Sequence, residues 1–359
     1  MLGCGFFDQL VGLEVGFGMD TGLAETAEEV SSIAFGFMAS KALFAGLHID
    51  VFTLLADGPK SSAEIAGKSG VPMNRVTTLM TALTSIGLVD RNEEGEIYSN
   101  SPGADAFLAK GAKYEFGDYL RYQIDQQMYP FLSQLNKVLD GSLDPEAVDS
   151  YQHWMSDPDQ ASVYSEAQHA GSLGPGRTLA RLVDLSNAET LLDVGGGTGA
   201  MSIRLLEAYP NLMATIIDFP NVAEIGWRFV SEASMVDRIR YIPSNALFAE
   251  WPKDQDAILM SYLFSGIPGT EVPRLVEYAF DCLAPGGAYM VHDFMVEDNR
   301  PGPPMAALWQ LQHMAFTPDA RSVTPGWLRG RLKEVGFVEI AEEEMIPGLT
   351  RLIHARKPG

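Results

Sequence analysis

The pattern of apolar and polar residues changes near residue 187. Before that point, apolar residues recur at helical spacing, and Val76, Leu79 and Leu83 fall on one face of a helix predicted over residues 73–86. After it, short apolar runs alternate with amphipathic stretches, which is the pattern of strands that alternate with helices. We therefore expect an α/β fold in which a doubly wound parallel sheet follows a helical region. Its strands are predicted at residues 190–194, 214–217, 239–242, 257–260 and 288–292, with a loop at 283–287.

The first part of the chain is predicted to form helices followed by a short hairpin. Ser61 and Glu64 have the spacing of a capping box at a helix N-terminus, and Glu94-Gly-Glu is typical of a hairpin tip within residues 90–99. This order is typical of winged-helix modules that bind DNA, but the second helix offers only Arg75 as a cation. We therefore expect a winged-helix-like module that packs or dimerises.

A long apolar run at residues 33–55 raises the question of a membrane span. Lys41, His48 and Asp50 interrupt it, so a buried helix pair is expected instead. Residues 1–20 lack the basic start of a signal peptide and are interpreted as an N-terminal extension. The remaining chain divides into a dimerisation domain (21–110), an aromatic-rich helical connector that lines a pocket (111–186) and the α/β domain (187–359).

Composition narrows the possible partners and the compartment. The chain has 25 Lys and Arg against 47 Asp and Glu, a formal net charge of −22. Nucleic acids and anionic membranes require a basic surface, so neither is an expected partner. Two cysteines give no disulfide framework, which favours a reducing cytoplasm. No metal site is expected.

The candidate chemistry lies in residues 191–220. Gly195, Gly197 and Gly199 follow the first predicted strand, and Asp218 ends the second, about 20 residues further on. Glycines let a backbone approach a ligand closely, and a carboxylate at that position holds ribose hydroxyls. A dinucleotide site has the spacing G-x-G-x-x-G, whereas here the third glycine comes one residue earlier and none follows at residues 200–202, so we expect another adenosine-containing cofactor.

The loop DVGGGTG resembles the S-adenosylmethionine loop of class I methyltransferases. Together with IIDFP, LAPGGAYMVHDF, TPDARSVT and the helical N-terminal region, it resembles the plant-type O-methyltransferase family and its bacterial relatives, from Thr21 to Lys357. The resemblance implies S-adenosylmethionine as cofactor, a small-molecule acceptor and a homodimer formed through the N-terminal domain. The cofactor-binding residues that it implies are Asp193, Gly195, Gly197, Gly199, Asp218, Asn245, Ala246 and Ser261.

The sequence departs from this family where the catalytic base is expected. The family has Leu-His-Asp-Trp after the fourth strand, whereas here Ser265, Gly266 and Ile267 occupy the last three positions. Serine is no base near pH 7. Three explanations stay open: a relocated base (His313 first, or His169, His292 or Tyr164), a cofactor-binding protein without catalysis, or an acceptor that needs no base.

A thioether sulfur has no proton to lose, so its methylation requires only proximity and alignment. In that hypothesis no catalytic residue is required. The chain is similar in its overall character to the methylthiohydroxybutyrate S-methyltransferases of dimethylsulfoniopropionate biosynthesis, which implies 4-methylthio-2-hydroxybutyrate as acceptor. The alternatives are a small-molecule O-methyltransferase with a relocated base and a non-catalytic binder. Arg121 is a further candidate for holding an acceptor carboxylate, and the candidate acceptor-binding residues are Tyr122, Gln126, Tyr164, Gln168, Trp309, Gln312, His313 and Phe316.

Overall fold

The computed structural model describes residues 23–112, 115–142, 151–300 and 302–359. The expected extension at residues 1–20 lies outside them. The chain divides after Tyr129 into two compact parts, which we call the N-terminal unit and the C-terminal unit. Each is described by itself.

The N-terminal unit packs helices against a small three-stranded sheet of order β1-β3-β2. The predicted helix is confirmed as α5, and the predicted hairpin as β2 and β3. The predicted capping box is also present, with the Ser61 hydroxyl accepting from the Glu64 amide. The elements are α2 (Ala27–His48), α3 (Val51–Ala56), β1 (Lys60–Ser61), α4 (Ser62–Ser69), α5 (Met73–Ser85), β2 (Val89–Arg91), β3 (Ile97–Asn100), α6 (Pro102–Phe107) and the π-helical η1 (Tyr119–Met128).

Helix α2 corrects the expectation of a buried helix pair. The pair exists as α2 and α3, but only Phe44, Gly46 and Leu47 of α2 are buried. Ile33, at 69% exposure, and Phe35, at 58%, face away from the core of their unit. Among the residues described, α2 is also the one helix long and apolar enough to cross a bilayer, judged by length and composition alone. The apolar residues of α2 are distributed around all sides of the helix. The periodicity of the sequence therefore could not show which of them would pack against the rest of the chain.

The C-terminal unit contains a seven-stranded sheet of order β6-β5-β4-β7-β8-β10-β9. The five predicted strands are confirmed as β4 to β8 and pair in parallel. The sequence pattern missed the last two strands, which are antiparallel to their neighbours, and the predicted loop at 283–287 is part of β8. The strands are β4 (Thr190–Val194), β5 (Met213–Asp218), β6 (Ile239–Pro243), β7 (Gln255–Ser261), β8 (Leu283–Asp293), β9 (Val338–Ile346) and β10 (Thr350–Arg356).

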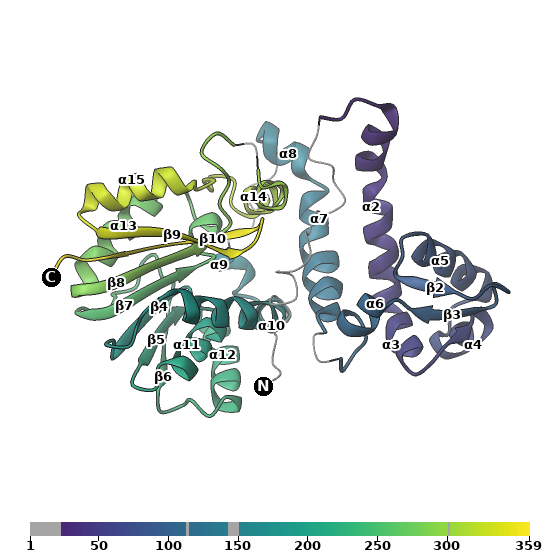
Figure 1. Ribbon diagram of the computed structural model, residues 1–359, viewed down its shortest axis with the longest axis horizontal. Coiled ribbons are helices and arrows are strands. Elements are labelled where there is room, and N and C mark those ends of the chain that lie inside the picture. Colours follow the sequence, from purple (N-terminus) through teal and green to yellow (C-terminus); the bar gives the residue numbers. More distant parts are fainter. Residues whose placement is uncertain (1–22, 113–114, 143–150, 301) are drawn as a thin grey trace. The chain divides into compact units, whose positions relative to one another are not determined.

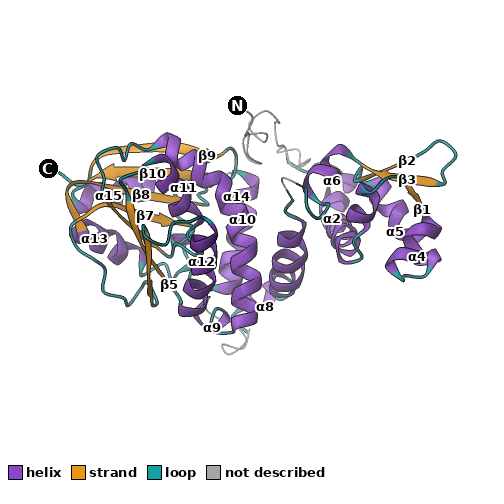
Figure 2. Ribbon diagram, turned by 90° about the horizontal axis from the view of Figure 1, so that it is seen from below, coloured by secondary structure: helices purple, strands orange, loops and turns teal. Residues whose placement is uncertain are grey.

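Helices cover both faces of this sheet (Figures 1 and 2). On one face Leu191 and Leu259 pack with Leu179 of α10 and Leu205 of α11. On the other face Leu192 packs in a cluster that includes residues of α13 and α15. The helices of this unit are α7 (Tyr129–Leu132, which begins at the division), α8 (Leu135–Asp140), α9 (Tyr151–Trp154), α10 (Pro158–Leu182), α11 (Ala200–Ala208), α12 (Pro220–Glu232), the 3-10 turn η2 (Phe264–Gly266), α13 (Val272–Cys282), α14 (Pro304–Phe316) and α15 (Pro325–Val335).

Candidate functional site

The glycine loop lies between the end of β4 and the start of α11. Gly195, Gly197 and Gly199 have φ values of 68°, 58° and 78°, a region that L-residues with side chains rarely adopt. The Gly195 amide donates to the Ile217 carbonyl at 2.8 Å, and the Gly197 amide donates to Asp218 Oδ2 at 2.7 Å. The structure therefore brings the loop and the acid together, as the sequence predicted.

Two carboxylates, the buried Asp193 and the half-buried Asp218, stand beside this loop. Asp218 also accepts from the Phe219 amide at 2.7 Å, and burial raises its pKa to about 6. Asp193 accepts from the Ser202 hydroxyl at 2.6 Å, and burial raises its pKa to about 7. Its second oxygen, Oδ1, has no hydrogen-bond partner among the described residues. A buried acceptor without a partner points to a donor supplied by a ligand.

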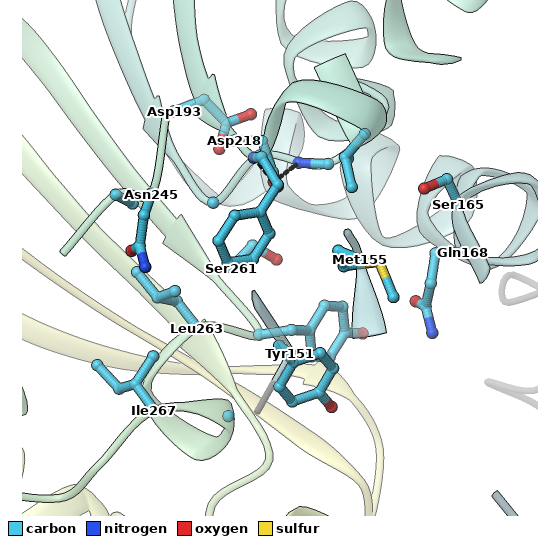
Figure 3. Close-up of a pocket in the computed structure, with 18 of the residues that line it drawn as sticks. Tyr151, Met155, Ser165, Gln168, Asp193, Asp218, Asn245, Ser261, Leu263 and Ile267 are labelled. Carbon is cyan, nitrogen blue, oxygen red and sulfur yellow. Dashed lines mark hydrogen bonds between the residues drawn. The ribbon is translucent and has the colours of Figure 1, made fainter. Parts of the chain in front are cut away.

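The loop and the two carboxylates form one end of a cavity of about 360 Å³, a size that suits a small molecule. Figure 3 shows Asp193 and Asp218 on one side of it and Tyr151 and Ile267 on the opposite side. Nine of the predicted site residues line this cavity: Asp193, Gly195, Gly197, Asp218, Asn245, Ala246, Ser261, Tyr164 and Gln168.

Three of the predicted cofactor residues also have local structural roles. Gly199 is outside the lining and caps the N-terminus of α11, where a Cβ would lie 2.8 Å from Ile216 Cδ1. The side-chain oxygen of Asn245 accepts from the backbone amide of Leu247 at 2.9 Å, and its Nδ2 donates to Gln152 Oε1 at 2.8 Å. The Ser261 hydroxyl is 2.9 Å from His292 Nδ1. Their contribution to cofactor binding stays a prediction.

Four predicted acceptor residues on α14 are not among the described lining residues. Trp309 stacks on Phe294, and Phe316 stacks on Trp154 with ring centroids 4.9 Å apart. Gln312 Nε2 lies 3.5 Å from the hydroxyl of Tyr151, which lines the cavity. His313 is 4% exposed, and both of its ring nitrogens lack a partner among the residues described.

Two further acceptor candidates, Tyr122 and Gln126, lie on η1 in the N-terminal unit. The cavity belongs to the C-terminal unit, so their role in binding the acceptor stays a prediction. Arg121 of η1 is already paired. It donates to the Leu47 carbonyl and the Asp50 carboxylate and forms an ion pair with Asp118. These partners all lie within its own unit, and the interpretation that Arg121 holds an acceptor carboxylate stays a prediction.

A serine that points into the protein occupies the position where the resemblance implies a base. Ser265 is 1% exposed, and its hydroxyl donates to Asp293 Oδ1 at 2.6 Å. Its neighbour Gly266 lines the cavity instead. A Cβ there would lie 3.2 Å from Tyr151 Cε2, so the absence of a side chain leaves room for the Tyr151 ring.

The histidines proposed as relocated bases are buried (His292 and His313) or half-buried (His169), and all three are neutral near pH 7. Burial lowers the pKa of His169 and of His313 to about 4, and that of His292 to about 3. The described lining residues include no histidine, lysine or arginine, and their only carboxylates are Asp193 and Asp218 at the glycine-loop end. Tyr164 is the one proposed base that lines the cavity.

Sequence reasoning missed Tyr151, Met155 and Phe219 as lining residues. Burial raises the pKa of Tyr151 to about 12, so its hydroxyl stays protonated and can donate a hydrogen bond. No motif marks Tyr151, which precedes α10 in an aromatic-rich stretch. Phe219 directly follows Asp218, and that adjacency was a usable signal.

Comparisons with known proteins match both units. The O-methyltransferase domain model matches residues 146–338, and the O-methyltransferase dimerisation domain model matches residues 31–110. The chain is 25% identical over 331 residues to the tetracenomycin polyketide synthesis 8-O-methyl transferase TcmO of Streptomyces glaucescens, covering 92% of this chain and 96% of that one. It is also 25% identical over 338 residues to the N,N-dimethyltransferase OxyT of Streptomyces rimosus, covering 92% and 97%.

Solved structures share the fold. Human N-acetylserotonin methyltransferase in complex with S-adenosylmethionine superposes with a TM-score of 0.82 at 21% identity, covering 95% of this chain and 100% of that one. At that identity the likeness concerns the fold alone.

Proposed function

This chain belongs to the O-methyltransferase family and is an S-adenosylmethionine-dependent enzyme, and we propose that it methylates a hydroxyl group of a small, uncharged acceptor in the cavity of the C-terminal unit. The relatives named above act on oxygen or on nitrogen, so family membership leaves the acceptor to be argued from the site.

The residues at the glycine-loop end fit this cofactor. Asp218 offers a carboxylate for the ribose hydroxyls, and Ala246 and Leu247 offer apolar surface for the adenine ring. The unpaired Oδ1 of Asp193 is an acceptor for a cofactor N–H group. A Cβ added at Gly197 meets no atom within 4 Å, so the loop backbone faces open space. When bound, the cofactor supplies a methyl group on a positively charged sulfur.

The observation that carries the proposal is the chemical character of the other end of the cavity. Tyr151, Tyr164 and Gln168 supply neutral hydrogen-bonding groups, and Met155 and Ile267 supply apolar surface. Apart from the phenol of Tyr164, the described residues of that end supply no base, neither a neutral imidazole nor a free carboxylate, so we expect the acceptor hydroxyl to ionise largely by itself. A hydroxyl that is conjugated to a carbonyl meets this requirement, and the protonated Tyr151 hydroxyl can hydrogen-bond such an oxygen.

The same lining keeps a second candidate, S-methylation of a thioether such as 4-methylthio-2-hydroxybutyrate. A thioether needs no base, which favours this reaction. Its carboxylate, however, would meet no cation among the described lining residues, and the chain carries a net charge of −22. For this reason the uncharged hydroxyl acceptor is the first proposal.

The test is methyl transfer from labelled S-adenosylmethionine to a matched panel: hydroxynaphthoquinones, the corresponding naphthols and 4-methylthio-2-hydroxybutyrate. We expect O-methylation of the hydroxyquinones, with an apparent pKa in the pH–rate profile that follows the pKa of each acceptor. One apparent pKa common to all acceptors would indicate a protein base and contradict the proposal. Sulfonium formation alone, with a flat profile, would replace it with the second candidate.

The proposed assembly is a homodimer through the N-terminal unit. Its dimerisation-domain match and the exposed apolar side chains of α2 support this proposal.

A further inference from the structure

The glycine loop has a single side chain by which the rest of the protein can hold it. Residues 195–199 are Gly-Gly-Gly-Thr-Gly, so Thr198 alone carries side-chain atoms. Thr198 is 4% exposed and lines the cavity. Its hydroxyl lies 2.8 Å from Nδ1 of His169, a residue of α10.

A loop of this composition needs such contacts. Glycines have more conformational freedom to lose than any other residue, and three of the four here hold positive φ values. The sheet holds the backbone of Gly197 from two sides: its amide donates to Asp218, and its carbonyl accepts from the Tyr241 hydroxyl at 3.2 Å. Among the residues that the structure describes, His169 makes the one hydrogen bond to a side chain of the loop, and it belongs to a helix that covers the sheet.

His169 is itself fixed in position. Its ring stacks on Phe229 of α12, with centroids 3.7 Å apart and an angle of 12° between the planes. The Arg228 guanidinium lies over the same Phe229 ring and pairs with Glu166 of α10 at 2.9 Å. Burial, together with the charges of Arg204 and Arg228, lowers the pKa of His169, so the imidazole is neutral near pH 7.

We propose that His169 is a positioning residue for the cofactor: through Thr198 it holds the glycine loop in the conformation that binds S-adenosylmethionine. His169 acts through Thr198 and is not itself among the residues that line the cavity. The adjacent residue Gln168 does line it, so α10 contacts the acceptor end of the cavity and also fixes the cofactor loop.

The test is a double-mutant cycle on the full chain with S-adenosylhomocysteine as probe. His169→Leu and Thr198→Val each remove one partner of the hydrogen bond and keep an apolar side chain of similar size. We expect each to weaken S-adenosylhomocysteine binding by about 3- to 10-fold in calorimetry, well below the melting temperature. The double variant should bind no more weakly than the weaker single variant, because the same interaction is lost only once.

Two further variants separate positioning from general stability. His169→Asn places an amide near the position of Nδ1 and should restore most of the affinity. His354→Leu removes a partly buried histidine on β10, outside the cavity lining, and should leave the dissociation constant unchanged. A lowered melting temperature for His169→Leu with unchanged affinity would overturn the proposal, as would multiplicative effects in the double variant. The acceptor plays no part in this measurement, so its result is independent of the proposed reaction.

Discussion

The hydroxyl of Ser265 donates a 2.6 Å hydrogen bond to the carboxylate of Asp293, and both side chains are buried. The carboxylate also accepts from the backbone amides of Ser265, at 3.0 Å, and Phe294, at 2.8 Å. Ser265 occupies the position where the sequence resemblance implies a base, yet here its side chain joins η2 to the end of β8. In this structure the residue at that position has a structural role.

Ser265→Ala should therefore reduce stability more than turnover. The substitution removes one donor from a buried carboxylate, which costs about 1–3 kcal/mol of the free energy of unfolding. Because the hydroxyl does not face the cavity, we expect kcat per folded molecule to change by less than about threefold, a change of under about 1 kcal/mol in the barrier. Urea denaturation and initial rates well below the melting temperature measure the two effects.

Ser162→Ala is the matched control for Ser265→Ala. Ser162 also donates to a carboxylate, that of Glu166, but at an exposed position where the loss should be small. A fall of several orders of magnitude in kcat for Ser265→Ala would show that this serine takes part in the reaction after all.

The cofactor end of the site could be predicted from the sequence, and the acceptor end could not. Gly197 and Asp218 meet because two parallel strands bring their carboxyl ends to one edge of the sheet, and that follows from local pattern alone. Tyr151 and Gly266 meet through packing between a short helix and a turn far apart in the chain, and no spacing rule connects them. For the same reason His313 could be proposed as a base, since only the structure shows its burial away from the cavity lining.

In the fold, too, some elements could be predicted from the sequence and others could not. Alternating apolar runs indicated β4 to β8, whereas β9 contains Glu342, Glu343 and Glu344 and has no apolar alternation to mark it as an edge strand. In α2 the error was of another kind. Apolar residues on every side of a helix indicate a surface to be covered, but they do not say whether the same chain or a second copy covers it.

Asp218→Ala should weaken cofactor binding strongly. It removes a charged acceptor for the ribose hydroxyls and also the group that fixes the Gly197 amide. A hydrogen bond to a charged group contributes about 1.5–3 kcal/mol, so the dissociation constant of S-adenosylhomocysteine should rise by about 10- to 150-fold in calorimetry. Asp237→Ala, at an exposed aspartate, is the control. A loss no larger than in that control would remove Asp218 from the cofactor site.

The stability of the cofactor-free protein should depend on pH through Asp193. Burial raises its folded-state pKa from 3.8 to about 7, so the folded chain binds this proton more tightly than the unfolded chain does. Its stabilising contribution is fully present below pH 3.8 and is lost as pH rises through about 7. The free energy of unfolding should therefore fall between pH 4 and pH 8 relative to Asp193→Asn, measured by urea denaturation at each pH. Parallel curves for the two proteins would contradict the raised pKa.

The exposed face of α2 should hold the homodimer together. Ile33→Asp and Phe37→Asp place a charge among apolar side chains that are 69% and 50% exposed in the single chain. If a second copy covers this face, sedimentation velocity should show a dimer for the original protein and a monomer for these variants. Met73→Asp changes an equally apolar side chain, 57% exposed, on α5 and serves as control. A monomeric original protein, or a dimer that all three variants retain, would rule out α2 as the interface.

Gly266→Ala should weaken binding of the acceptor while leaving binding of the cofactor nearly unchanged. The added Cβ would stand 3.2 Å from Tyr151 Cε2, so the Tyr151 ring must move by a few tenths of an ångström within an aromatic cluster that includes Tyr164 and Phe316. Overpacking of this kind costs about 1–3 kcal/mol, and here the strain falls on the acceptor end. We expect KM for the acceptor to rise by about 5-fold or more, while the affinity for S-adenosylhomocysteine changes by less than about 2-fold. Gly171→Ala is the control, because a Cβ at that helical glycine meets nothing within 4 Å. Equal losses in acceptor KM and cofactor affinity would show that Tyr151 belongs to the cofactor end, and the acceptor would then have to be sought elsewhere along the cavity wall.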